Sequence, residues 1–314
     1  MTAHFLDGME PGHDGLLALV DRALALRAGA PARRFEGKSL AAVFFDPSLR
    51  TRTSLEVACA QLGVHPVVLH PSTDAWGWAY GEGEVMDGAA AEHVNEAIPV
   101  LASYADALAI RCFASDAVLD AAARLSSVPV LNLESPRGHP LQGLADAATW
   151  RSRLGPSLVG RRLCLTWAPH PRPLPRAVPH QVVRTATQLG MDVVVAHPEG
   201  LDLDPDVMAR SAAVAAARGG RLSVTHDQAE ALAGAEVVYA KAWSGPMAAP
   251  SWQVDALPAS TGFMHCLPVR RNVVVSDAVL DGAGSWVQEQ AALRRWTALA
   301  VLEHLLGGGS WASS

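Results

Sequence analysis

The side chains best suited to chemistry lie where a strand-like segment turns into a helical one, in FFDPSLRTRTSLEVACAQLG at residues 44–63. Ser48, Arg50 and Thr51 stand at that junction. The start of a helix has unpaired backbone N–H groups and the positive end of the helix dipole, and an arginine adds a planar fork that fits phosphate or carboxylate oxygens. We therefore predict an anion site here. The alternative is an ordinary N-cap followed by exposed arginines.

Polar side chains also follow other apolar segments of the first half. Arg111 ends one such segment and Glu134 ends another, with His139 and Gln142 close behind. Ligands of open parallel sheets bind beyond the carboxyl ends of the strands. Polar residues at several strand ends therefore indicate a binding site at that edge of the sheet. A single histidine after a strand is more often structural. The Gly-rich fingerprints of dinucleotide and nucleoside triphosphate sites are missing, which favours a small phosphorylated ligand.

The second half repeats this arrangement. His170 lies in WAPHPRPLP, whose prolines restrict the backbone; an ordinary surface crossover is the alternative. Lys241, one of two lysines in the chain, ends another apolar segment, and its ammonium can lose a proton where a guanidinium cannot. His265 and Cys266 fall within a further predicted strand. Because adjacent strand residues point to opposite faces, we do not expect them to form a Cys–His nucleophile.

These residues need a scaffold of alternating strands and helices. Apolar, β-branched segments predict strands at 40–45, 65–70, 105–112 and 128–134, and again at 161–168, 191–198, 221–226, 236–242 and 263–267. Such alternation is typical of parallel sheets. We therefore predict an α/β fold of two parallel-sheet domains, residues 1–150 and 151–287. A helix at 139–155 bridges them, a last helix at about 288–306 packs back on the first domain, and the ligands bind in an interdomain cleft.

The composition excludes several classes of protein. Of the 314 residues, 50% are hydrophobic and 18% are charged, and the net charge of -6 comes without any basic block. We therefore expect no nucleic-acid partner. No segment has the length of a membrane span or the pattern of a signal peptide, so we expect a cytoplasmic protein. The four cysteines are scattered and form no CxxC pair, which argues against a zinc site or disulfides.

Three motifs together carry a family resemblance. FxxxSxRTR occurs at residues 44–52, HPxQxLAD at 139–146 and HCLP at 265–268. The sequence resembles the aspartate/ornithine carbamoyltransferase superfamily from about residue 40 to residue 300. Its WAPHPRPLP and HCLPVRRN segments are similar to those of the N-acylornithine carbamoyltransferases. The resemblance implies carbamoyl transfer from carbamoyl phosphate to the δ-amine of an N-acylated ornithine, in arginine biosynthesis, with no metal or organic cofactor.

The resemblance also implies a role for each matching residue. The phosphate would bind Ser48, Leu49, Arg50, Thr51, Arg111 and Arg294. The carbamoyl group would bind Thr51, His139, Gln142 and the backbone carbonyls of Cys266 and Leu267. Catalysis would depend on Arg50, Thr51, Arg111 and His139, and the acyl-ornithine would bind Glu134, His170, Lys241, Leu267 and Arg270. Trp76 would bind at a neighbouring subunit's site, which implies a homotrimer.

Two positions bear on the acyl group. Within MDGAAAEH, Ala91 stands where the acetyl-ornithine enzymes have glutamate and the succinyl-ornithine type has proline. A glutamate would fill space and repel a succinyl carboxylate, and alanine removes both obstacles. Val274 stands where the acetyl-ornithine enzymes have a modifiable lysine. We predict N-succinyl-L-ornithine as acceptor. The alternatives are acetyl-ornithine or another amine, a Rossmann oxidoreductase, and a binding protein without activity.

Overall fold

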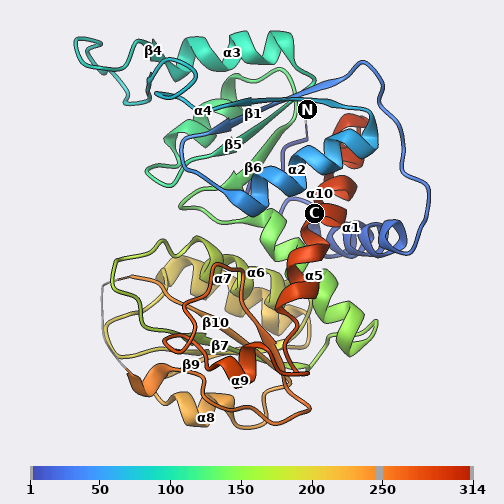
Figure 1. Ribbon diagram of the computed structural model, residues 1–314, viewed down its shortest axis with the longest axis vertical. Coiled ribbons are helices and arrows are strands. Elements are labelled where there is room, and N and C mark those ends of the chain that lie inside the picture. Colours follow the sequence, from blue (N-terminus) through green and yellow to red (C-terminus); the bar gives the residue numbers. More distant parts are fainter. Residues whose placement is uncertain (1–2, 245–249, 312–314) are drawn as a thin grey trace. The chain divides into compact units, whose positions relative to one another are not determined.

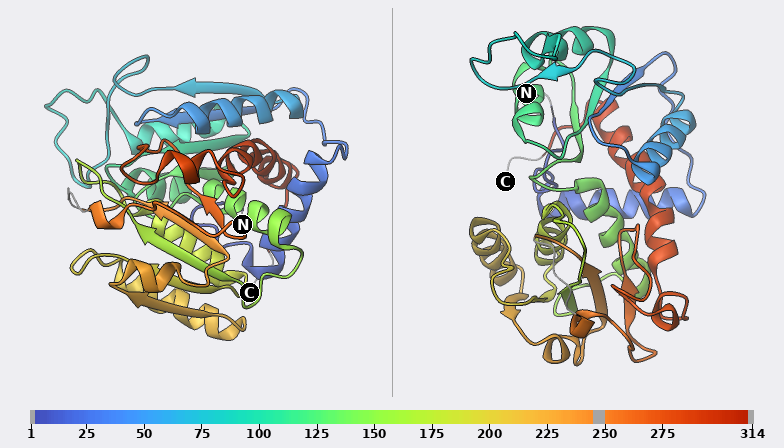
Figure 2. Two further views of the ribbon diagram at one scale, coloured as in Figure 1. Left: turned by 60° about the horizontal axis from the view of Figure 1, so that its bottom comes forward. Right: turned by 60° about the vertical axis from the view of Figure 1, so that its left-hand side comes forward.

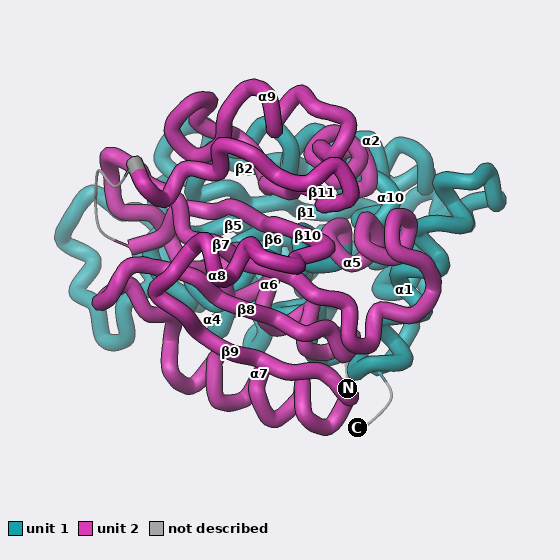
Figure 3. Tube along the Cα trace, turned by 90° about the horizontal axis from the view of Figure 1, so that it is seen from below, with its two compact units in different colours: residues 1–144, 294–314 teal, residues 145–293 magenta. Residues whose placement is uncertain are grey.

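The computed structural model describes residues 3–244 and 250–311 (Figure 1). The chain forms two compact units, residues 1–144 with 294–314 and residues 145–293 (Figure 3). Each unit contains a parallel β-sheet with helices packed on it, as Figures 1 and 2 show. The predicted α/β fold with two parallel sheets is thus confirmed. The division between the units falls within two helices, α5 (Pro140–Leu154) and α10 (Val287–Leu306).

The sheet of unit 1 has four parallel strands in the order β2-β1-β5-β6. They are β1 (Ser39–Phe44), β2 (His65–Leu69), β5 (Ala107–Arg111) and β6 (Val130–Glu134). The inner strands β1 and β5 are almost entirely buried, which explains their continuous apolar sequences. Strand β2 is half exposed and contains Pro66. Proline has no backbone N–H to donate to a neighbouring strand, so it is largely confined to edge strands such as β2.

Helices lie on both faces of this sheet. The chain passes from β1 to β2 in one direction across the sheet and from β5 to β6 in the other. Because such crossovers are right-handed, α2 (Leu49–Leu62) lies on the face opposite α3 (Val94–Tyr104) and α4 (Ala117–Leu125) (Figure 1). Apolar side chains of α3, α4, β1 and β5 form one buried cluster. The remaining elements of the unit are α1 (Gly12–Arg27) and a short parallel pair, β3 (Trp78–Ala79) and β4 (Glu92–His93).

Unit 2 contains five parallel strands in the order β11-β10-β7-β8-β9. They are β7 (Arg162–Trp167), β8 (Asp192–Ala196), β9 (Arg221–Thr225), β10 (Val237–Lys241) and β11 (Gly262–Met264). Helices α6 (Ala177–Gln188) and α7 (Pro205–Ala217) pack together on one face, and the short α8 (Gln228–Leu232) lies on the crossover back to β10. The unit also contains a 3-10 turn (Pro250–Trp252) and α9 (Asp277–Leu280).

The last predicted strand is too long. We expected a strand to residue 267, but β11 ends at Met264. The backbone N–H of His265 donates to the Gln290 side chain at 3.1 Å and so leaves the ladder. His265 and Cys266 therefore lie beyond the strand. Our expectation that their side chains point to opposite faces assumed that both lie within a strand, and that assumption was wrong. Instead, Nδ1 of His265 accepts from the N–H of Leu267 at 2.9 Å.

No helix in the described part of the chain is both long and apolar enough to cross a bilayer.

Candidate active site

The predicted anion site at the start of α2 has a well-formed N-cap. Ser48 has an extended backbone and its hydroxyl accepts from the N–H of Thr51 at 3.2 Å. The first turn of α2 contains no acidic residue, so the helix end keeps its positive character. Before the cap, Oδ2 of Asp46 accepts from the N–H of Phe113 at 2.7 Å, which ties this turn to the segment that follows β5. The start of α2 is therefore fixed next to the end of the neighbouring strand.

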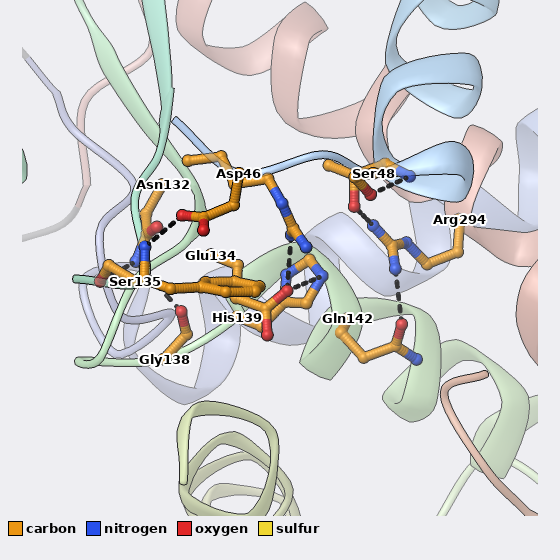
Figure 4. Close-up of polar contacts among 12 residues, drawn as sticks. Asp46, Ser48, Asn132, Glu134, Ser135, Gly138, His139, Gln142 and Arg294 are labelled. Carbon is orange, nitrogen blue, oxygen red and sulfur yellow. Dashed lines mark hydrogen bonds and ion pairs between the residues drawn. The ribbon is translucent and has the colours of Figure 1, made fainter. Parts of the chain in front are cut away.

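A buried arginine links this helix start to α5. Arg294 on α10 is 4% exposed. Its Nη1 donates to Oε1 of Gln142 at 2.7 Å and its Nη2 donates to the hydroxyl of Thr51 at 2.8 Å (Figure 4). Because the Thr51 hydroxyl oxygen accepts a hydrogen bond from Arg294, the hydroxyl proton must point away from the guanidinium. In that orientation the hydroxyl can donate to a carbonyl oxygen. Arg294 therefore positions two of the predicted carbamoyl-binding side chains.

Strands β5 and β6 bring two further predicted residues together at their carboxyl ends. Arg111 and Glu134 are register partners, and the register shifts between Ile110 and Arg111. Nη1 of Arg111 donates to Oε2 of Glu134 at 2.6 Å, and both side chains are largely buried. The same carboxylate oxygen lies 3.6 Å from Nε2 of His139. Glu134, which we assigned to the acyl-ornithine, is thus an ion-pair partner of the predicted phosphate ligand Arg111.

His139 lies in a strongly cationic environment. Its side chain is 4% exposed. Burial, and then the nearby guanidiniums of Arg294, Arg111 and Arg50, hold the pKa of His139 well below its usual range. The imidazole is therefore neutral at pH 7. A neutral imidazole can donate an N–H to an oxygen that gains negative charge without adding a formal charge of its own.

A set of polar residues that the sequence analysis missed holds the loop between β6 and His139. The Asn132 amide donates to Ser135 Oγ at 3.1 Å, and Ser135 Oγ donates to Asp116 Oδ1 at 2.6 Å. The backbone N–H of Arg137 donates to the same oxygen of Asp116 at 3.1 Å. Asn132 is fully buried in the middle of an apolar strand. A polar residue at such a position is a detectable signal, because it requires hydrogen-bond partners.

Trp76 and Ala91, both exposed, lie on one loop region of unit 1. The Trp76 side chain is 72% exposed. The N–H of Ala91 donates to the carbonyl of Gly77, the residue next to Trp76, at 3.0 Å. A cavity of about 510 Å³ is lined by Trp76 and by residues of the loop, β3, β4 and α3, including Asp74, Trp78 and Glu92. Ala91 and Trp76 are thus neighbours, whereas no described contact joins them to His139.

The residues predicted in unit 2 follow its strand ends. Lys241 is the last residue of β10, and its carbonyl accepts from the N–H of Ala168 at 3.1 Å. The loop that contains His170 is fixed to the same region, since Leu174 and Ser244 exchange two backbone hydrogen bonds. Nδ1 of His170 lies 2.8 Å from the carbonyl of Arg172 in its own loop. The structure therefore places the His170 loop beside the segment that follows Lys241.

A second loop of unit 2 contains Cys266, Leu267 and Arg270. Arg270 is exposed, and its carbonyl accepts from the N–H of the buried Val274 at 2.9 Å. The adjacent Arg271 is engaged in ion pairs with Asp277 and Asp281. Arg270 is thus the more available of the two guanidiniums for a ligand.

Three of the four cysteines offer little nucleophilic chemistry, and the fourth, Cys266, is partly exposed. Cys59, Cys112 and Cys164 are buried, and burial raises the pKa of Cys59 and of Cys164 to about 12. Among the described residues, no group of three or more His, Cys, Asp or Glu side chains is placed to hold a metal ion.

Two family models match the chain. The carbamoyl-P binding domain of aspartate/ornithine carbamoyltransferase matches residues 3–152, and the Asp/Orn binding domain of the same family matches residues 176–305. The sequence is 38% identical to an N-acetylornithine carbamoyltransferase of Xanthomonas campestris pv. campestris, over 97% of this chain and 98% of the relative. It is 36% identical to an N-succinylornithine carbamoyltransferase of Bacteroides thetaiotaomicron, over 86% of this chain and 88% of the relative.

A similar solved structure is that of an N-acetyl-L-ornithine transcarbamylase mutant in which alanine replaces one glutamate. It is complexed with carbamyl phosphate and N-succinyl-L-norvaline. Its TM-score is 0.91 at 38% identity, and the match covers 96% of this chain and 99% of that chain.

The environment of His139 predicts its behaviour on acidification. Because its pKa is lowered in the folded state, the unfolded chain takes up a proton first as the pH falls below about 6.5. Titration followed by imidazole NMR signals, assigned with His139→Gln, should show no His139 midpoint near 6.5. The free energy of unfolding should also fall less steeply below that pH in His139→Gln than in the unchanged protein. A midpoint at or above 6.5 would contradict the described burial.

Proposed function

Since the chain belongs to the aspartate/ornithine carbamoyltransferase family and is a carbamoyltransferase, we propose that it transfers the carbamoyl group of carbamoyl phosphate to the δ-amine of N-succinyl-L-ornithine. The amine nitrogen forms a bond to the carbonyl carbon, the bond from that carbon to the phosphate oxygen breaks, and one N–H proton is released. The products are N-succinyl-L-citrulline and inorganic phosphate. This reaction belongs to arginine biosynthesis.

The observation that carries the proposal is the cationic cluster of unit 1. The capped start of α2, with Ser48 and Arg50, lies in the same polar environment as Arg111, His139 and Arg294. Negative charge grows on the carbonyl oxygen and the departing phosphate in this reaction, and preorganised donors stabilise it. We assign the phosphate to Ser48, Leu49, Arg50, Thr51 and Arg111.

The carbamoyl group is assigned to Thr51, His139 and Gln142, two of which are positioned by Arg294. The backbone carbonyls of Cys266 and Leu267 are further proposed acceptors for its NH2 group. The acyl-ornithine is assigned to Glu134, His170, Lys241, Leu267 and Arg270. Correct placement of two ligands contributes strongly to such reactions, because it removes much of the entropic cost of bringing them together.

The succinyl assignment is supported by two side chains rather than by overall similarity. The acetyl- and succinyl-ornithine relatives are 38% and 36% identical to the chain, which does not separate them. Ala91 lacks the carboxylate that would repel a succinyl group, and Val274 is buried and cannot form a carbamylated lysine. The transcarbamylase mutant with one glutamate replaced by alanine is complexed with a succinyl ligand, which agrees with this interpretation.

We also propose a homotrimer in which Trp76 contributes to a neighbouring subunit's site, and a cytoplasmic location. The large exposed area of Trp76 supports the first proposal. Because Ala91 is hydrogen-bonded next to Trp76, both residues would serve the same subunit's site. The acyl-discriminating residue would then come from the neighbouring copy.

An acceptor panel tests the proposal directly. Succinyl-ornithine, acetyl-ornithine and free ornithine are each offered with carbamoyl phosphate, and phosphate release is measured. We expect the highest kcat/KM for succinyl-ornithine. A higher value for acetyl-ornithine would overturn the acyl assignment, and no release with any amine would overturn the proposed reaction.

Restoring a carboxylate at the acyl position should reverse the preference. In Ala91→Glu, like-charge repulsion should lower kcat/KM for succinyl-ornithine by about tenfold, equivalent to about 1.4 kcal/mol, while acetyl-ornithine is affected less. Ala89→Glu adds the same charge to an exposed position of the same loop and serves as the control. An equal loss in the two variants would show that residue 91 does not discriminate.

The anion site should depend on one arginine of α2. Arg50→Ala should lose about 3 kcal/mol of transition-state stabilisation, roughly 150-fold in kcat/KM, as other lost oxyanion donors do. Arg52→Ala is a matched control, because Arg52 is exposed and pairs with Glu56 on the outside of the helix. Turnover of Arg50→Ala equal to that of Arg52→Ala would remove the proposed role.

A further inference from the structure

The ion pair between Arg111 and Glu134 occupies a donor that the proposed phosphate site needs. Oε2 of Glu134 accepts from Nη1 of Arg111 at 2.6 Å. Their side chains are 8% and 13% exposed, so solvent screens the pair weakly. The guanidinium also lies over the Phe113 ring, with its central carbon 4.4 Å from the ring centroid. Arg111 is therefore held in place from one side by an aromatic face and from another by a carboxylate.

Two buried polar atoms beside this pair have no partner among the described residues, and one of them, Nε of Arg111, is a donor. The other is Nδ1 of His139. Buried polar atoms without partners are rare in folded proteins and require an explanation. The cations that act on His139 are those of Arg50, Arg111 and Arg294. Glu134 is the carboxylate that forms an ion pair with this group in the described structure.

We propose that Glu134 is an internal counter-ion of Arg111, which a bound phosphoryl group displaces. The inference rests on the proposed phosphate site and extends it. A dianion on Arg111 repels a carboxylate a few ångströms away, and it supplies the acceptor oxygens that Nε of Arg111 lacks. Phosphate binding therefore includes the work of separating Glu134 from Arg111. Glu134 weakens phosphate binding while it keeps the arginine ordered.

The displaced carboxylate then has a second use. An amine-bearing acceptor carries positive charge on its δ-nitrogen in solution, and a carboxylate without its arginine partner attracts that charge. Glu134 thus couples the two substrates, because the donor's phosphate releases the side chain that receives the acceptor. The same coupling favours release of inorganic phosphate after the reaction, when Glu134 returns to Arg111.

The test is the affinity of the full-length protein for inorganic phosphate, measured by calorimetry at fixed ionic strength and without acceptor. Glu134→Gln removes the charge with little change of shape, and it should bind phosphate about tenfold more tightly. Glu134→Asp keeps the charge and should stay close to the unchanged protein. Glu56→Gln also removes one negative charge, but from the exposed pair with Arg52, and should show no such gain. In turnover, Glu134→Gln should raise the KM for acyl-ornithine.

A double-mutant cycle shows whether Glu134 acts through Arg111. In an Arg111→Met background, the gain from Glu134→Gln should disappear. Unchanged or weaker phosphate binding by Glu134→Gln, or the same gain without Arg111, would overturn the inference.

A separate measurement tests the proposed phosphate site itself. If the unchanged protein binds phosphate and Arg50→Ala weakens that binding, the site stands even when Glu134→Gln has no effect. If the protein and its variants bind no phosphate, both the site and the role of Glu134 are overturned.

Discussion

The proposed chemistry of unit 1 depends on an excess of positive charge around the buried side chain of His139. The guanidiniums of Arg50, Arg111 and Arg294 all act on this imidazole, and Glu134 is the carboxylate paired with Arg111. Buried charges are costly unless they have partners, so the two buried arginines, Arg111 and Arg294, must be held by hydrogen bonds or neutralised. The excess accounts for two properties at once. It keeps the histidine neutral, and it makes a multiply charged anion a favourable ligand.

The scaffold meets this electrostatic cost with short, specific contacts. The register between β5 and β6 sets Arg111 opposite Glu134, and the irregularity at Ile110 and Arg111 falls at that point. Below it, Asn132, Ser135 and Asp116 fix the loop that ends at His139. Such residues touch no substrate in the proposed reaction. In that proposal their role is to hold the assigned side chains within the small tolerances that catalysis requires.

Most of the fold followed from local patterns in the sequence. Buried parallel strands have continuous apolar sequences. Ser48 caps the start of α2 with its hydroxyl, and Gly63 ends the helix in a left-handed conformation that glycine favours. The strand at residue 263 was overextended, because His265 donates to a side chain, Gln290, that lies far along the sequence. Local patterns do not contain that information.

The sequence analysis named residues for the candidate site, but it could not predict how their side chains pair with one another. Arg111 and Glu134 were indicated by their positions at strand ends as well as by the family resemblance, and Arg294 by the resemblance alone. Their ligand roles stay predictions. The structure pairs Glu134 with Arg111, and Arg294 with Thr51 and Gln142. Those pairings depend on strand register and helix packing, which no spacing in the sequence reveals.

The hydrogen bond between Arg294 and Thr51 joins side chains 243 residues apart. A ribosome that has made all strands of the first sheet has therefore not yet made the arginine that donates to Thr51. Nascent chains lack this hydrogen bond until α10 has been made. Thr51 and Gln142 are thus held by Arg294 only after α10 has been made, and polypeptides truncated before α10 cannot form these two contacts.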